Sequence, residues 1–212
     1  MRWSELLTLL DGVALFDSAM LLAGKEPPAE VRRQLSRWVA SGRLHQLRRG
    51  LYALAPPQAR EVPDPLAVAA RLHRPSYVSL QSALAYHGVI PEAVPVVTSV
   101  TTGRPRRYTT PLGDFVYRHV HASLFWGYQQ LANGPGQAVY IASPEKALLD
   151  LVHLTRGPIR RRFLEELRLA AGQLDPETLQ RLARRTMKPK LIRAASLAAR
   201  LLAKGPRKQE AP

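Results

Sequence analysis

Three stretches near the start of the chain place apolar side chains at helical spacing. They cover residues 3–10, 16–24 and 28–41. The third stretch begins at Pro27-Pro28 and ends before Gly42, which is the usual punctuation of a helix. Its apolar positions form one stripe, made of Val31, Leu35, Trp38 and Val39. The pattern therefore predicts three helices, and the third has an opposite face that is free for contacts.

A hairpin is predicted directly after the third helix. Residues 44–48 and 51–54 read as two short strands, and Gly50 suits the positive φ of a hairpin tip. Three helices followed by a hairpin are the order of a winged helix-turn-helix, in which the third helix enters the major groove and the hairpin contacts the flanking backbone. We therefore expect an α+β fold that begins with a winged helix-turn-helix at residues 1–55.

A change of composition separates this unit from the rest of the chain. Residues 56–64 are rich in proline and predict a stiff, extended linker. The mixed α/β domain expected beyond it, at residues 65–205, has strands at about 95–142 and helices at about 143–205. The segment 76–90 also reads as a helix, capped by Ser76 or Ser79, and Ser143 is a strong cap for a later helix. Residues 206–212 are predicted to be a flexible tail.

The net charge favours an anionic partner. The formal charge is +15 and the pI is about 11.0, which says little about fold but favours nucleic acid, an anionic membrane or an acidic protein. The absence of cysteine excludes disulfides and thiolate metal sites. No apolar run approaches the ~20 residues of a membrane span. We expect a cytoplasmic protein that is not bound to a membrane.

Basic residues gather on the two predicted elements that would touch DNA. No acidic residue occurs between Val31 and Gly50, and localised charge of this kind is more informative than net charge. Arginine can bridge guanine, and its phosphate contacts add salt-dependent affinity. The predicted DNA-binding residues are Arg32, Arg33, Ser36, Arg37, Arg43, His45, Arg48 and Arg49. The competing interpretation is a solvated helix face beside a hairpin with a soluble tip.

Two further basic regions have two interpretations each. Arg104, Arg106 and Arg107 surround Pro105 between strand-like runs, and they predict either a rigid basic loop that contacts a toxin or nucleic acid, or an exposed turn. Residues 158–212 carry fourteen Lys/Arg and five Asp/Glu. Their helices have either a solvated charged face or a second surface for a polyanion.

We expect no enzyme, metal or cofactor. Ser143 and Lys146 match S-x-x-K, but capping explains Ser143 and the companion motifs S-D-N and K-T-G do not occur. Magnesium-dependent nuclease motifs and a phosphate-binding P-loop do not occur either. His119 and His121 would share a strand face without a clear third ligand, so we predict no metal site.

Four segments in order resemble the AbiEi family of antitoxins from bacterial type IV toxin–antitoxin systems. They are "RLHQLRRGLYAL", "SYVSLQSALAYHGVIPEAVP", "TSVTTGRPRRYTTPLGDFVYRHV" and "IASPEKALLDLVHL". The resemblance covers about residues 5–155. It implies a winged helix that represses the protein's own operon, and a second domain with antitoxin activity against a nucleotidyltransferase-like toxin. By position, it implies that residues 28–41 read DNA and that residues 44–54 form the wing.

The expected partners are operator DNA and this toxin. One winged helix covers a short half-site, so we expect repeated half-sites occupied by several copies of a monomer. Whether the toxin is contacted directly stays open. Two alternatives also stay open: a stand-alone winged-helix transcriptional regulator, and a protein-interaction module that binds an acidic toxin and has only non-specific affinity for DNA.

Overall fold

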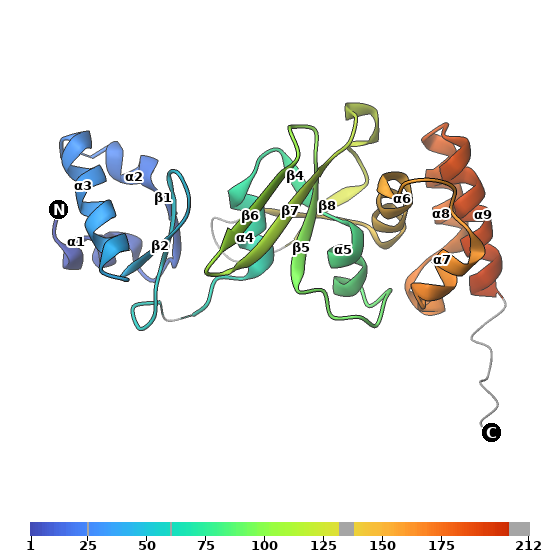
Figure 1. Cartoon of the computed structure of the whole chain (residues 1–212), viewed down its shortest axis with the longest axis horizontal. Helices are drawn as coiled ribbons and strands as arrows, with labels where there is room; N and C mark the ends of the chain where they lie inside the picture. Colours follow the sequence, from blue (N-terminus) through green and yellow to red (C-terminus); the bar gives the residue numbers. More distant parts are fainter. Residues whose placement is uncertain (25, 60, 132–137, 204–212) are drawn as a thin grey trace, which may run out of the picture.

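The computed structural model describes residues 1–24, 26–59, 61–131 and 138–203, and the predicted tail at 206–212 lies outside this range. The fold is α+β, as predicted. In Figure 1 a small helical unit with its own sheet lies at one end, a larger sheet lies in the middle, and a group of helices forms the other end.

The N-terminal part contains three helices and a three-stranded antiparallel sheet. The helices are α1 (Trp3–Leu10), α2 (Ser18–Leu22) and α3 (Pro28–Ala40), and the strands are β1 (Leu15–Asp17), β2 (Leu44–Arg48) and β3 (Leu51–Leu54). The sheet order is β1-β3-β2. Strand β1 was not predicted, because a three-residue strand is too short to show a period of two, and its last two residues fell within the predicted second helix.

Helix α3 forms as its apolar pattern predicts. Val31, Leu35 and Trp38 are buried, and the Trp38 ring meets the Trp3 ring edge-on with centroids 5.1 Å apart. This contact fixes α3 against α1 and leaves the arginine face of α3 exposed.

The second part is built on a six-stranded mixed sheet with the order β6-β7-β5-β4-β9-β8. Its strands are β4 (Ser76–Val78), β5 (Val96–Thr101), β6 (Arg106–Thr110), β7 (Gly113–His119), β8 (Tyr128–Leu131) and β9 (Val139–Ala142). Helix α4 (Pro65–Leu72) precedes these strands, α5 (Leu80–Tyr86) lies between β4 and β5, and α6 (Pro144–Leu154) follows β9. The predicted helix over 76–90 is partly wrong, since its first residues form the central strand β4.

Three further helices follow in the described residues, and the last two of them pack on α6. These are α7 (Arg161–Glu166), α8 (Pro176–Arg185) and α9 (Pro189–Ala203), with the short 3-10 helix η2 (Ala171–Gln173) between α7 and α8. Another 3-10 helix, η1 (Ala122–Leu124), lies between β7 and β8. The predicted cap of α6 is confirmed, because the Lys146 backbone N–H donates to Ser143 Oγ at 3.2 Å.

The small N-terminal sheet is buried on both of its faces. One face carries Phe16, Tyr52 and Leu54 and packs on the helices of its own part. The other face joins the second part in a single apolar cluster. That cluster contains Leu15, Leu47, Leu51, Ala53, Val68, Ala69, Leu72, Phe115 and Tyr117. The two parts therefore share a core, although a proline-rich segment joins them.

Candidate nucleic-acid interface

Helix α3 presents four of the predicted DNA-binding residues together on one exposed face. They are Arg32, Arg33, Ser36 and Arg37. Arg33 forms an ion pair with Glu30 one turn earlier, and Ser36 Oγ donates to the Arg32 carbonyl at 3.0 Å. Exposed pairs of this kind are worth about 0–1 kcal/mol, so Glu30 does not prevent Arg33 from contacting another anion.

Of the next two predicted residues, Arg43 is exposed directly after α3 and His45 lies in β2. The Arg43 guanidinium lies 5.5 Å from the centre of the Trp3 ring, close enough for a cation–π contact. His45 is half-buried in β2. The ring of Trp3 limits the positions available to Arg43, whereas His45 lies opposite Ala53 on the sheet face toward the second part.

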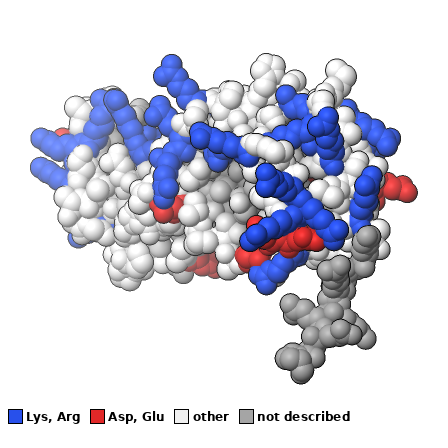
Figure 2. Space-filling model, turned by 45° about the vertical axis from the view of Figure 1, so that its right-hand side comes forward, with Lys and Arg blue, Asp and Glu red and all other residues white. Residues whose placement is uncertain are grey.

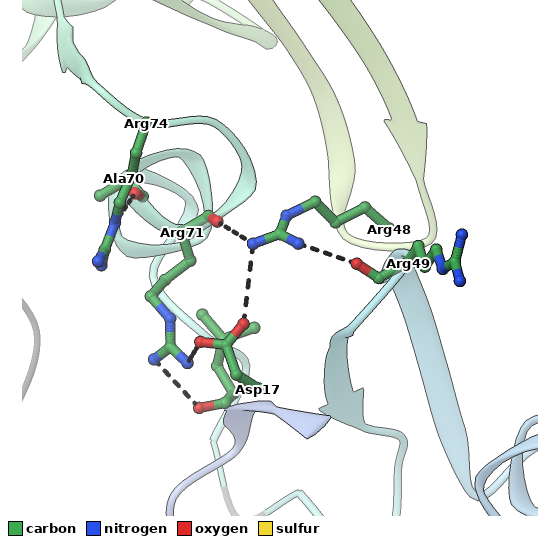
Figure 3. Close-up of polar contacts among 7 residues, drawn as sticks. Asp17, Arg48, Arg49, Ala70, Arg71 and Arg74 are labelled. Carbon is green, nitrogen blue, oxygen red and sulfur yellow. Dashed lines mark hydrogen bonds and ion pairs between the residues drawn. The ribbon is translucent and has the colours of Figure 1, made fainter. Parts of the chain in front are cut away.

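The two arginines of the hairpin tip differ in environment. Arg49 is exposed, whereas the Arg48 side chain is 35% exposed and turns toward α4. In Figure 3, Arg48 Nη2 donates to the Arg71 carbonyl at 3.1 Å and Nη1 donates to the Arg49 carbonyl at 2.9 Å. Arg48 therefore ties the hairpin to the second part, where the sequence had predicted a solvent-facing wing arginine.

Asp17 and Arg71 form an ion cluster with Arg48 at this contact. Arg71 Nη2 donates to Asp17 Oδ2 at 2.7 Å, and Asp17 Oδ1 lies 3.7 Å from Arg48 Nη2. Sequence reasoning missed Asp17 and Arg71, because they are 54 residues apart and no local pattern connects them. The basic run Arg71 to Arg74 at the end of α4 was the available signal.

His73 lies at the same junction and is held in an unusual setting. Its ring centre is 5.0 Å from that of Tyr117, and its buried Nε2 finds no hydrogen-bond partner within the described residues. Burial, Arg106 and Arg48 together lower the pKa of His73. Arg48 of the N-terminal part and Arg106 of the second part therefore both disfavour the protonated form of His73.

The predicted basic loop at 104–107 is mostly a strand. Arg104 precedes β6, while Arg106 and Arg107 lie within it, and all three are exposed. Arg107 Nη2 is 3.4 Å from Asp114 Oδ2 on β7. Arg106 lies opposite Tyr117 on the neighbouring strand, which places it toward His73. The three arginines therefore do not act as one loop.

The C-terminal helices carry charge in two kinds of setting. Arg161 and Arg162 pair with acids one turn later, Glu165 and Glu166. Arg185 instead lies over the Trp126 ring, 4.4 Å from its centre. Figure 2 shows Lys and Arg side chains extending over the upper half of the molecular face, with fewer Asp and Glu side chains, mostly lower down.

The Ser143–Lys146 pair has no catalytic geometry in this structure. Ser143 Oγ caps α6, and the Lys146 ammonium bonds instead to Tyr77 and Asp150 inside the core. His119 Nδ1 lies 2.9 Å from the Gly103 carbonyl and His121 lies beyond the end of β7. Within the described ranges, no three His, Asp or Glu residues are grouped to hold a metal ion.

Comparison with known proteins finds no matching family model and no matching curated protein. In the part of the chain that the structure describes, no helix has the length and apolar character needed to cross a membrane.

Proposed function

We propose that the protein is a DNA-binding regulator whose N-terminal part is a winged helix-turn-helix. The observation that carries this proposal is the exposed arginine face of α3, positioned by the element order α1-β1-α2-α3-β2-β3 and its antiparallel sheet. In such folds the last helix enters the major groove, where arginine contacts base edges and phosphates. Arg33 and Arg37 have the exposure that this role requires.

The wider role that we propose is that of an antitoxin. The resemblance to AbiEi antitoxins supports a repressor of its own operon that also counteracts a nucleotidyltransferase-like toxin. The toxin would be encoded next to it, and the operator would contain repeated half-sites. Co-expression with the neighbouring nucleotidyltransferase-like protein tests this role, because the antitoxin should restore growth that the toxin arrests. Growth arrest that persists with the antitoxin present would reduce the proposal to a stand-alone regulator.

A second candidate is a module that binds an acidic protein. Met187 is 84% exposed at the turn between α8 and α9 and is flanked in sequence by Arg185 and Lys188. Met and Arg are enriched in protein–protein interfaces, so this turn favours a protein partner for the C-terminal helices. The two candidates differ in DNA specificity, since electrostatic attraction alone gives salt-sensitive binding without sequence preference.

The test is a titration of the protein against the DNA upstream of its own coding sequence and against a scrambled duplex, at two salt concentrations. We expect a preference of about a thousandfold or more for the upstream DNA. The variant Arg33→Ala/Arg37→Ala should reduce that preference by about tenfold or more, since a bidentate arginine–base contact gives about 1–3 kcal/mol of discrimination.

The matched control is Arg161→Ala/Arg162→Ala. It removes the same charge from an exposed face of another helix, where both arginines pair with glutamates as Arg33 does. The control should retain the preference of the wild-type protein. Equal binding of wild-type protein to both duplexes would refute sequence-specific regulation and favour the acidic-partner module.

A further inference from the structure

Basic side chains from both parts of the molecule meet where the hairpin tip touches the second part. Strand β2 lies alongside edge strand β6, and Arg106 of β6 lies opposite Tyr117, whose ring contacts His73. Electrostatic influence links the groups as well, since Arg48 and Arg106 both lower the pKa of His73. Arg49 and Arg106 are exposed, so this junction offers charge to a partner.

Asp17 is the carboxylate built into this junction. Its side chain is 43% exposed and it bonds unequally to its two arginines. The contact with Arg71 is a hydrogen bond of 2.7 Å, whereas the contact with Arg48 is an ion pair at 3.7 Å. Arg48 is held mainly by two main-chain carbonyls. Asp17 therefore neutralises charge at the junction without being needed to orient Arg48.

Asp17 is also not needed to start helix α2. It occupies the N-cap position of α2, but its side chain accepts no capping hydrogen bond. Replacing its carboxylate by an amide therefore removes a charge and leaves the local helix start unchanged. The residue can be tested without disturbing α2.

We propose that this junction is a second contact for DNA phosphate, in which Arg106 of the second part adds its charge to that of the hairpin tip, and in which Asp17 competes with the phosphate and limits affinity. The proposal rests on the DNA-binding role proposed above and extends it to a surface outside the N-terminal part. Because the two parts share an apolar core, the hairpin and the strand that carries Arg106 are held in a fixed relation. A phosphate beside the hairpin then meets two elements that are already packed together, and binding does not have to order one against the other.

The experiment compares three single variants of the full chain, titrated against the upstream and the scrambled duplex over a range of salt concentrations. Arg106→Ala should weaken binding to both duplexes by about two- to fivefold, the range of one exposed ion pair. It should also reduce the slope of log affinity against log salt by about 0.9, the value for one phosphate contact. Asp17→Asn should strengthen binding to both duplexes by about two- to fivefold.

Arg74→Ala is the matched control. Arg74 is exposed at the end of α4, and in Figure 3 its guanidinium extends away from Arg49. The control removes one positive charge near the junction and should leave the salt slope at its wild-type value. An equal change in slope for Arg74→Ala and Arg106→Ala would overturn the proposal, because the effect would then be one of net charge.

A gain of affinity in Asp17→Asn cannot arise from misfolding, so this variant is a stringent test. Unchanged or weakened binding in a variant with the wild-type melting temperature would overturn the competing role of Asp17. A DNA-free measurement checks the geometry, because Arg106→Ala should raise the pKa of His73 in an NMR titration. No rise would overturn the placement of Arg106 at the junction.

The two proposals can fail separately. Equal binding of the wild-type protein to both duplexes would refute specific regulation. The salt slopes of the variants on the scrambled duplex would still test the junction. Absence of binding to either duplex would overturn both.

Discussion

At the scale of single residues, Lys146 carries a charge into the core of the second part. Lys146 and Asp150 are each only 2% exposed, and they form an ion pair one helical turn apart. Lys146 Nζ donates to the Tyr77 hydroxyl at 2.9 Å, while Tyr77 and Ser79 donate to Asp150 at 2.9 and 2.8 Å. Burial lowers the pKa of Lys146 and raises the pKa of Asp150, and their mutual attraction opposes both shifts. Each charge is tolerated because the other is present.

Removing one member of this pair should destabilise the protein strongly. Asp150→Ala leaves the Lys146 ammonium buried without its counter-charge, and the expected loss in free energy of unfolding is about 3–5 kcal/mol. Glu166→Ala is the matched control, because it breaks a pair of the same helical spacing on an exposed surface. Urea unfolding monitored by circular dichroism measures both. A similar small loss for the two variants would contradict the importance of burial.

Two histidines should make the folded state less stable in mild acid. Burial lowers the pKa of His73 and of His153, with further contributions from Arg106 and Arg48 at His73 and from Lys188, Lys190 and Lys146 at His153. The pKa of each histidine in the folded protein lies below the unfolded value of 6.5. As the pH falls through 6.5, the unfolded chain therefore binds more protons than the folded protein does. Stability is therefore lost from about pH 7 downward, toward the folded pKa values.

The variant His73→Gln should show a shallower fall of melting temperature between about pH 7 and pH 5 than the wild-type protein. His121→Gln, at an exposed position, provides a matched control. Parallel curves for the wild-type protein and His73→Gln would show that His73 does not contribute to the acid sensitivity.

At the scale of elements, long helices and their caps could be predicted, and short strands could not. The stripe of Val31, Leu35 and Trp38 predicts α3 because a buried helix face repeats every three to four residues. Ser143 identifies the start of α6 because capping is local chemistry. Strands β1 and β4 have three residues each, and their pairing depends on partners that are distant in the sequence.

The hairpin illustrates how part of the candidate site was missed. All four residues of β3 are buried, from Leu51 to Leu54, and an unbroken apolar run is typical of a strand that is covered on both faces. The unbroken apolar run "LYAL" therefore indicated a strand covered on both faces, but the sequence does not identify the residues that cover the second face. The covering residues come from α4 and β7, and this long-range packing is also what turns Arg48 away from solvent. The exposed arginines of α3, in contrast, followed directly from the helical period.

At the scale of the whole molecule, the shared core should make the two parts unfold together. Leu51 is fully buried at the junction, and Leu51→Ala should lower the free energy of unfolding by about 2–5 kcal/mol. Thermal unfolding should remain a single transition that moves to lower temperature. Leu9→Ala, at a leucine that is 53% exposed, is the matched control and should change little. Two separated transitions in the wild-type protein would contradict cooperative unfolding.

The two-sided burial of the small sheet also determines how the chain can be divided. A fragment that ends at the proline-rich segment near residue 56 would carry Leu15, Leu47, Leu51 and Ala53 into water on one continuous sheet face. Exposed apolar sheet faces promote self-association. Grafting residues 1–55 onto another scaffold would therefore require polar residues at these four positions, or a new apolar surface to replace α4 and β7.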